Sequence, residues 1–133
     1  ANWTFYMYED RALDMTHLLS CPGYQRMAES SAGEGLQEIH IATALRSHPR
    51  RARDPAAAHA FYLPILEYTS LRSNRCGNST HESRMRDALK ALKASPWFRR
   101  RGGQDHFWAT SKSFVWGADL NNTRLARSRR SIT

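Results

Sequence analysis

The sequence contains no apolar run of about 18 residues, the length that a membrane-spanning helix needs. It also has no glycine-rich phosphate loop and no Gly-x-Ser-x-Gly elbow, which excludes the commonest nucleotide-binding and serine-hydrolase motifs. No two histidines have the spacing of a zinc-binding helix, so the sequence predicts no metal site. A length of 133 residues fits one domain with one core and excludes two full domains with a cleft between them.

Lysine is scarce, since 17 of the 20 basic residues are arginine. The charge is also uneven: residues 1–48 have a net charge of −3 and residues 49–133 a net charge of +11, which together give the +8 of the chain. A basic half of this kind attracts phosphates, sulfates or anionic sugars. A solvated arginine-rich surface is the alternative. The arginines are scattered rather than interleaved with stacking aromatics, which argues against a nucleic-acid partner.

Cysteine is scarce as well, and two residues are too few for a disulfide framework. Cys21 and Cys76 lie 55 positions apart and form either one disulfide or two buried thiols. Three N-glycosylation sequons begin at Asn2, Asn78 and Asn121. Three sequons favour the lumen of the secretory pathway, where disulfides also persist.

Alternating strand and helix patterns predict an α/β fold. Strands are predicted over residues 3–8, 59–63 and 107–116, and helices over residues 34–47 and 81–94. The second strand is a continuous apolar run, which is typical of a parallel strand buried on both faces. The order strand, helix, strand, helix, strand predicts a three-layer, Rossmann-like parallel sheet with right-handed crossovers.

Shorter signals predict where the elements begin and end. A capping box of Ser79 and Glu82 is expected to begin the last helix. Pro22 is expected to end a short helix over residues 12–19. Residues 99–103 are basic, end in glycine and are expected to form a loop.

The densest group of reactive side chains is the segment Gly-Gly-Gln-Asp-His-Phe-Trp, which begins at Gly102. Gly102 and Gly103 permit a sharp turn. We expect this turn to place Asp105 and His106 at the carboxyl-side rim of the sheet, where open α/β sheets bind ligands. Phe107 is expected to be buried, with His106 pointing away from the core or into a cleft. The alternative is an aspartate that caps the turn and a histidine that bonds to the backbone.

Four segments occur in a characteristic order. They are Phe-Tyr-Met-Tyr-Glu-Asp at residues 5–10, Arg-Asp-Pro at 53–55 with Phe-Tyr-Leu-Pro at 61–64, Ser-Pro-Trp at 95–97, and Gly-Gly-Gln-Asp-His-Phe-Trp at 102–108. Together they resemble the N-terminal half of the exostosin family of glycosyltransferases (glycosyltransferase family 47). The resemblance covers residues 3–118. Gln104 departs from the family pattern, which often has a basic residue there.

The resemblance implies a GT-B glycosyltransferase that transfers a sugar from a nucleotide-sugar to a glycan or glycoprotein acceptor. Residues 1–118 are then the acceptor-side domain, and residues 119–133 are a basic tail of unknown structure. The nucleotide-sugar donor is expected to bind a C-terminal domain outside this chain. The chain is therefore expected to be a fragment that is inactive alone and holds no cofactor. The implied location is the Golgi lumen, through a membrane anchor that also lies outside the chain.

A glycosyltransferase of this kind needs a base to take the proton of the acceptor hydroxyl, and Asp105 and His106 are the local candidates. Candidate substrate contacts precede this pair in a basic, glycine-ending stretch: Arg99, Arg100, Arg101, Gly102 and Gly103. A solvated loop is the alternative interpretation of the arginines. A non-catalytic glycan- or polyanion-binding module is the alternative function. A nucleic-acid-binding domain explains the charge, but neither the sequons nor the four segments.

Overall fold

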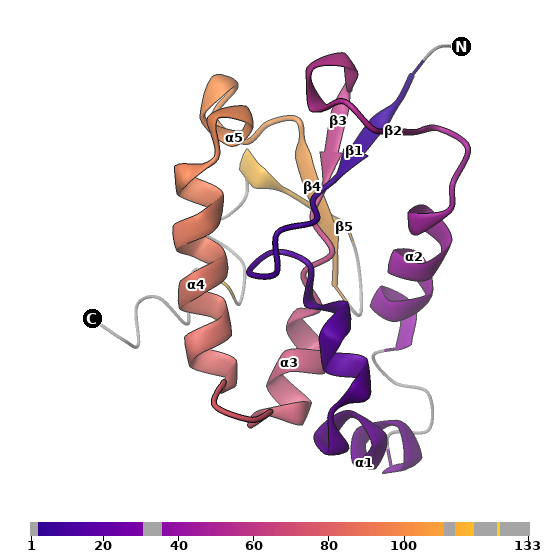
Figure 1. The fold of residues 1–133 in the computed structure, drawn as a ribbon, viewed down its shortest axis with the longest axis vertical. Coiled ribbons are helices and arrows are strands. Elements are labelled where there is room, and N and C mark those ends of the chain that lie inside the picture. The colour runs from indigo at the N-terminus through magenta and orange to yellow at the C-terminus, as the bar shows by residue number, and fades with distance from the viewer. Residues whose placement is uncertain (1–2, 31–35, 111–113, 119–124, 126–133) are drawn as a thin grey trace.

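The computed structural model describes residues 3–30, 36–110, 114–118 and 125. They form three layers, in which a central sheet separates helices that lie on its two sides (Figure 1). Within the described residues, no helix is long and apolar enough to cross a membrane.

The sheet has five strands in the order β2-β1-β3-β4-β5. They are β1 (Phe5–Met7), β2 (Arg51–Ala52), β3 (Ala60–Tyr62), β4 (His106–Ala109) and β5 (Phe114–Trp116). Strand β1 pairs in parallel with β2 and with β3, and β3 pairs in parallel with β4. The predicted α/β fold with parallel strands is confirmed.

The helices connect these strands. They are η1 (Met15–Ser20), α1 (Pro22–Ser30), α2 (Leu36–Arg46), η2 (Pro55–Ala57), α3 (Glu67–Ser73), α4 (His81–Ala94) and α5 (Pro96–Arg100), where η denotes a 3₁₀ helix. Helices α4 and α5 lie on one side of the sheet and α2 lies on the other (Figure 1). Helices α2 and α4 confirm the two predicted long helices, and η1 occupies the place of the predicted short one.

The prediction of a single strand over residues 107–116 is wrong in one respect, because this segment contains two strands. Strands β4 and β5 pair antiparallel, with Phe107 opposite Trp116 and Trp108 opposite Val115. The polar residues that interrupt the apolar pattern separate the two strands. The chain therefore reverses direction between β4 and β5, within the range predicted as one continuous strand.

The cap of α4 is one residue later than predicted. The hydroxyl of Thr80, rather than that of Ser79, accepts a hydrogen bond from the backbone N–H of Ser83 at 3.2 Å. In return, Ser83 Oγ accepts from the backbone N–H of Thr80 at 2.9 Å. Serine therefore takes the place predicted for Glu82, because the hydroxyl of the residue directly before the helix is the one that reaches the third N–H.

Pro22, which was expected only to end a helix, begins one, and so does a second proline. Pro22 begins α1 and Pro96 begins α5, in the first helical turn, where a missing N–H costs no hydrogen bond. The loop predicted over residues 99–103 is therefore wrong in its first part, because Arg99 and Arg100 belong to α5.

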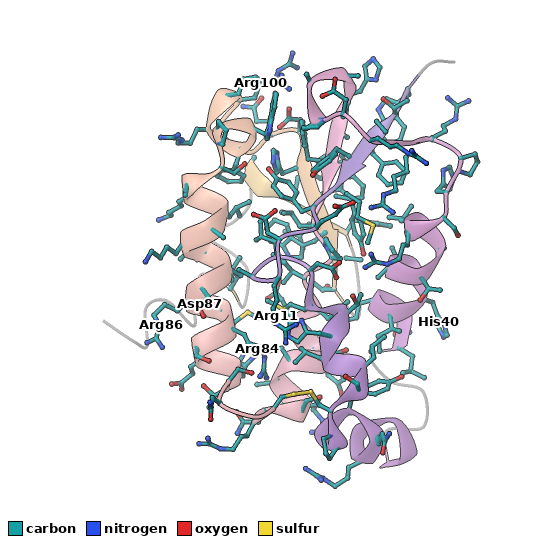
Figure 2. The ribbon with its side chains drawn as sticks, in the orientation of Figure 1. Arg11, His40, Arg84, Arg86, Asp87 and Arg100 are labelled. Atoms are coloured by element: carbon teal, nitrogen blue, oxygen red, sulfur yellow. A yellow bond between two sulfur atoms is a disulfide. The ribbon has the colours of Figure 1, made fainter. Side chains whose placement is uncertain are left out.

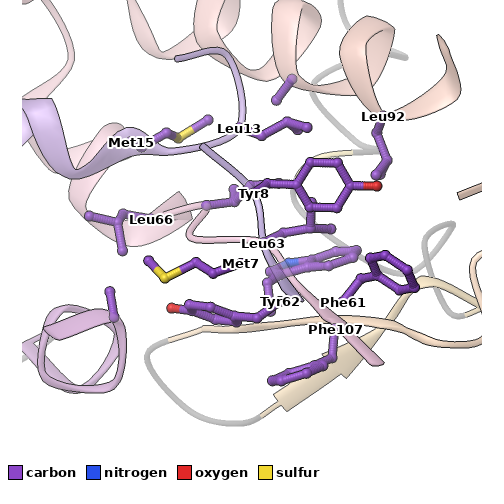
Figure 3. Packing of buried hydrophobic residues seen from close by; sticks show 14 of the residues in the cluster. Met7, Tyr8, Leu13, Met15, Phe61, Tyr62, Leu63, Leu66, Leu92 and Phe107 are labelled. Atoms are coloured by element: carbon purple, nitrogen blue, oxygen red, sulfur yellow. The ribbon is translucent and has the colours of Figure 1, made fainter. Parts of the chain in front are cut away.

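The core covers both faces of the sheet (Figure 3). The strand register and the alternation of side chains place Phe61, His106 and Trp108 on one face. Tyr62 and Phe107 lie on the other face. All five side chains are buried. Strand β4 is buried along its whole length, because it lies between two other strands and both faces of the sheet are covered at this position.

Cys21 and Cys76 form a disulfide, with their Cα atoms 5.8 Å apart. It ties the start of α1 to a tight turn in which Cys76 and Ser79 exchange two backbone hydrogen bonds of 2.9 and 3.0 Å. Helix α1 also crosses α3 closely, since a Cβ at Gly23 would lie 2.5 Å from the carbonyl oxygen of Ser73. Glycine at this position allows the two backbones to approach.

Candidate functional site

Asp105 and His106 do not lie at the carboxyl-side rim of the sheet, where they were predicted. They precede and begin β4, so they lie at the edge from which this parallel strand starts, and the ligand edge of such sheets is the opposite one. His106 is also fully buried, at 0% exposure, instead of pointing away from the core. It faces α5, where the Phe98 ring stands nearly perpendicular to the imidazole, with ring centroids 5.1 Å apart and 81° between the planes. The predicted burial of Phe107 is confirmed.

Gly102 and Gly103 form the turn into β4, with φ angles of 60° and 81°. The backbone N–H of Gly103 donates to the carbonyl of Phe98 at 2.9 Å. A Cβ at Gly103 would lie 2.5 Å from the Phe98 ring. Positive φ at both positions and close packing at the second account for the two glycines without any ligand.

A chain of hydrogen-bonded side chains connects β1, α4 and β4, and we call it the Tyr8–Asp105 chain. His106 Nδ1 donates to Asp105 Oδ1 at 2.9 Å. Because Nδ1 holds the proton, Nε2 is an acceptor, and the Tyr8 hydroxyl donates to it at 2.8 Å. The Ser95 hydroxyl donates to the Tyr8 oxygen at 2.7 Å. At the other end, Arg100 Nη2 lies 3.5 Å from Asp105 Oδ2.

Burial decides the ionisation of this chain. It lowers the pKa of His106 below the usual histidine range, although the neighbouring Asp105 acts in the opposite direction. The imidazole is therefore neutral at pH 7. Burial also raises the pKa of Tyr8 to about 12, so the phenol keeps its proton. His106 and Tyr8 are thus neutral, and the hydrogen bonds from Ser95 through Tyr8 and His106 all point towards Asp105.

The Ser95 end of this chain reaches a cavity of about 360 Å³ between β1 and the junction of α4 with α5. We call this cavity the tyrosine groove. Its lining includes Tyr8 and Ser95, the aromatic residues Tyr6 and Trp97, and the exposed residue Asp10. Aromatic surface with a few polar groups is the usual composition of a small-molecule site.

The structure separates the three candidate arginines. The guanidinium of Arg100 lies 5.3 Å from the centroid of the Trp97 ring and 5.7 Å from that of Phe61, within cation–π range. Arg100 therefore belongs to the wall beside the tyrosine groove. Arg99 and Arg101 are exposed, and neither forms an ion pair with the described part of the chain.

Two groups of buried polar residues escaped the sequence analysis. Tyr8 lies 98 positions from His106, and Ser95 lies between α4 and α5, so no single short motif shows that the three side chains meet. The buried carboxylates Glu38 and Glu67 showed no signal either, since they lie in ordinary helical segments. Such pairings follow from the packing of the sheet and helices, not from spacing along the chain.

Both buried carboxylates bind backbone and side-chain donors. Glu38 accepts from the backbone N–H and the hydroxyl of Thr69, each at 2.7 Å, and thereby caps the first turn of α3. Burial raises the pKa of Glu38 to about 7. Glu67 accepts from Trp108 Nε1 at 2.6 Å and from the backbone N–H of Leu125 at 3.0 Å. Within the described residues, no three His, Cys, Asp or Glu side chains converge in a way that would hold a metal ion.

Of the three sequons, Asn78 is the one that the structure describes, and Asn2 and Asn121 lie outside the described residues. Asn78 is exposed in the turn that follows Cys76. The basic tail predicted over residues 119–133 also lies outside the described residues, apart from Leu125.

This α/β domain, with the tyrosine groove against one face of its sheet, matches a known family. The family described as Exostosin GT47 domain matches residues 5–132. The chain therefore belongs to the exostosin GT47 family, as the four sequence segments predicted.

A curated relative in Arabidopsis thaliana is named "Probable arabinosyltransferase ARAD1" and is 31% identical over 94 residues. The match covers 66% of this chain and 21% of the relative, so the chain spans about a fifth of the relative's length. No solved structure matches the chain.

Proposed function

We propose that this chain is the acceptor-side part of a glycosyltransferase that transfers a sugar from a nucleotide-sugar to a glycan or glycoprotein, with inversion at the anomeric carbon. Membership of the exostosin family over residues 5–132 is the observation that carries this proposal. The name of the curated relative makes pentosyl transfer the first activity to test, before hexosyl transfer. In this proposal the donor binds a second domain of a GT-B enzyme, outside this chain, and the enzyme works in the Golgi lumen.

The tyrosine groove is the acceptor surface in this proposal. A sugar ring has an apolar C–H face and an equatorial belt of hydroxyls. The rings of Tyr6 and Trp97 suit the C–H face, and the groups at Tyr8, Ser95 and Asp10 suit the hydroxyls. The Tyr8–Asp105 chain fixes the Tyr8 hydroxyl in one orientation, so this part of the groove is preorganised.

Direct displacement at the anomeric carbon requires a base that removes the proton of the acceptor hydroxyl. Asp105 and His106 are 9% and 0% exposed, which argues against direct contact between either residue and a substrate. In our proposal both are positioning residues that act through Tyr8. The base is then Asp10, because its carboxylate is exposed and lines the groove.

The test is sugar transfer by the full-length gene product and by residues 1–133 alone, with a panel of nucleotide-sugars and glycan acceptors. We expect transfer by the full-length protein and none by this chain above a boiled control. Asp10→Asn should lower kcat at an unchanged melting temperature. Glu9→Gln is the matched control, since Glu9 is the neighbouring carboxylate and does not line the tyrosine groove. The absence of transfer with every donor would overturn the proposal, and transfer by this chain alone would overturn the placement of the donor site.

The burial of Asp105 and His106 favours a second candidate, a non-catalytic glycan-binding module. Such a module keeps the groove for binding and needs no base. Glycan binding by the full-length protein, without transfer, would support this function over catalysis. Co-localisation of a fluorescent fusion of the full-length protein with a Golgi marker tests the proposed location.

A further inference from the structure

The segment between α3 and α4 is held in one shape by a covalent link and by backbone hydrogen bonds. Cys76 and Ser79 close a tight turn through two backbone hydrogen bonds, and Gly77 within it has a φ of 58°. The disulfide joins Cys76 to Cys21, the residue directly before α1. In Figure 2 it is the yellow bond between α1 and the segment that leads from α3 to α4. The disulfide therefore fixes this turn to a helix that lies far from it in sequence.

The sequon that begins at Asn78 runs from this turn directly into the cap of α4. Its second residue, Ser79, accepts a hydrogen bond from Nη1 of the buried Arg84 at 2.7 Å. Its third residue, Thr80, holds its hydroxyl against the first turn of α4, where it accepts from the backbone N–H of Ser83 at 3.2 Å. In the folded protein the second and third residues of the sequon are thus already engaged.

Asn78 itself is exposed, so a glycan on its amide nitrogen would project into solvent and fit the finished turn. Attachment of that glycan makes a different demand. The enzyme that adds N-glycans recognises an asparagine together with the hydroxyl two residues later, so it must reach both side chains and the backbone between them. In the fold this backbone bends through the turn, and the hydroxyl of Thr80 lies in the helix cap. Glycan addition therefore requires the turn to be open.

The disulfide and the sequon become available at nearly the same moment of synthesis. Cys21 is made 55 positions before Cys76, and Asn78 follows Cys76 after one residue. A chain grows by about 5–20 residues per second, whereas a disulfide forms in seconds or longer. The closing of the turn and the addition of a glycan therefore compete for the same interval.

We propose that Asn78 accepts an N-linked glycan only before Cys21 and Cys76 are joined, so that disulfide formation sets the glycan occupancy of this site. In this step the amide nitrogen of Asn78 forms a bond to the anomeric carbon of an oligosaccharide carried on a lipid pyrophosphate. The bond between that carbon and the pyrophosphate oxygen breaks, the lipid pyrophosphate leaves, and the amide loses one of its two protons. Both reactions belong to the lumen of the secretory pathway, and in this respect the proposal rests on the proposed function.

The test expresses the full-length gene product in eukaryotic cells and measures the glycan occupancy of each sequon by mass spectrometry. We expect Asn78 to be partly occupied in the wild-type protein and almost fully occupied in Cys21→Ser, which removes the disulfide without altering the residues around the sequon. The occupancy of Asn2 and Asn121 should not change. Ile39→Ala is the matched control, because it weakens the core from α2, on the other side of the sheet from α4, and keeps both cysteines. It should leave the occupancy of Asn78 at the wild-type value.

Cell-free synthesis of the full-length protein into microsomes, with and without a reductant, is the second measurement. A reductant present during synthesis delays the disulfide in the wild-type protein and should raise the occupancy of Asn78. It should have no effect on Cys21→Ser, which has no such disulfide to delay. This comparison does not depend on whether the variant folds.

Three results would overturn the inference. They are an unmodified Asn78 beside modified Asn2 and Asn121, equal occupancy of Asn78 in the wild-type protein and in Cys21→Ser, and an equal rise in Ile39→Ala, which would make slow folding the cause. The absence of glycans from all three sequons would overturn the proposed location as well. Sugar transfer by a protein in which Cys21→Ser changes no occupancy would refute this inference alone. A rise in occupancy without any sugar transfer would refute the proposed function alone.

Discussion

The imidazole of His106 lies almost parallel to the ring of Phe61, with ring centroids 4.6 Å apart and 9° between the planes. The two residues are direct neighbours across β3 and β4, so the stack is a cross-strand pair on a covered face of the sheet. Both nitrogens of the imidazole therefore need partners inside the protein, and Tyr8 and Asp105 provide them. Changes to these partners should affect stability before they affect any substrate.

Tyr8→Phe should lower the free energy of unfolding by about 1–3 kcal/mol, because it leaves His106 Nε2 buried without a donor. The variant also removes the acceptor of the Ser95 hydroxyl. Chemical denaturation followed by circular dichroism measures the change. Tyr6→Phe is the matched control on the same strand, since Tyr6 is only partly buried, and it should change stability by less than about 0.5 kcal/mol. Equal effects of the two substitutions would contradict a structural role for the Tyr8–Asp105 chain.

Asp105→Ala should be more destabilising than Arg100→Ala. The first leaves the buried N–H of His106 without an acceptor, which costs about 1–3 kcal/mol and lowers the melting temperature by several degrees. The second removes a 3.5 Å ion pair of a side chain that is 40% exposed, together with its contact to the Trp97 ring. Solvent screening limits that loss to about 1 kcal/mol. Thermal unfolding of both variants is the measurement, and a larger loss for Arg100→Ala would contradict this order.

Local patterns were sufficient to predict the main layers of the fold. The apolar run before Pro64 predicted β3, and the apolar stripe of residues 81–94 predicted α4, because in each case burial of one segment decides its local structure. Strand β2 has two residues, and its position depends on its pairing with β1, so no pattern within it predicts a strand.

The sequence was sufficient to predict which residues form the candidate site, but not where in the fold that site lies. The glycine turn and the proximity of Asp105 to His106 follow from adjacent residues and were predictable. The burial of His106 depends on Tyr8, which is 98 positions away, and on the helix that covers that face of the sheet. Asp105 and His106 were assigned to the wrong edge of the sheet. Residues before a parallel strand lie at its amino end, and only residues after a strand lie at the edge where ligands bind.

Replacement of both Cys21 and Cys76 by serine should lower the free energy of unfolding by about 4 kcal/mol. The disulfide closes a loop across a sequence separation of 55, and the loss follows from the larger conformational freedom of the unfolded chain. Denaturation of the variant beside the wild-type protein is the measurement. Wild-type protein in reducing buffer should lose a similar amount, while reductant should not affect the variant. A variant as stable as the wild-type protein would show that the link contributes nothing to the fold.

Glu38→Gln should flatten the pH dependence of stability between about pH 4.5 and pH 7. Burial, together with the nearby Glu67, raises the pKa of Glu38 from 4.5 to about 7, so in this range the folded protein holds a proton that the unfolded chain has released. The stabilisation is complete below pH 4.5 and is lost as the pH rises to about 7, by roughly 3 kcal/mol in all.

The lowered pKa of His106 acts in the opposite sense, since its stabilisation is lost as the pH falls below 6.5. The difference between the wild-type and Glu38→Gln unfolding free energies, measured at several pH values, isolates Glu38, because His106 is common to both. A difference that stays constant from pH 4.5 to pH 7 would mean that Glu38 has an ordinary pKa in the folded protein.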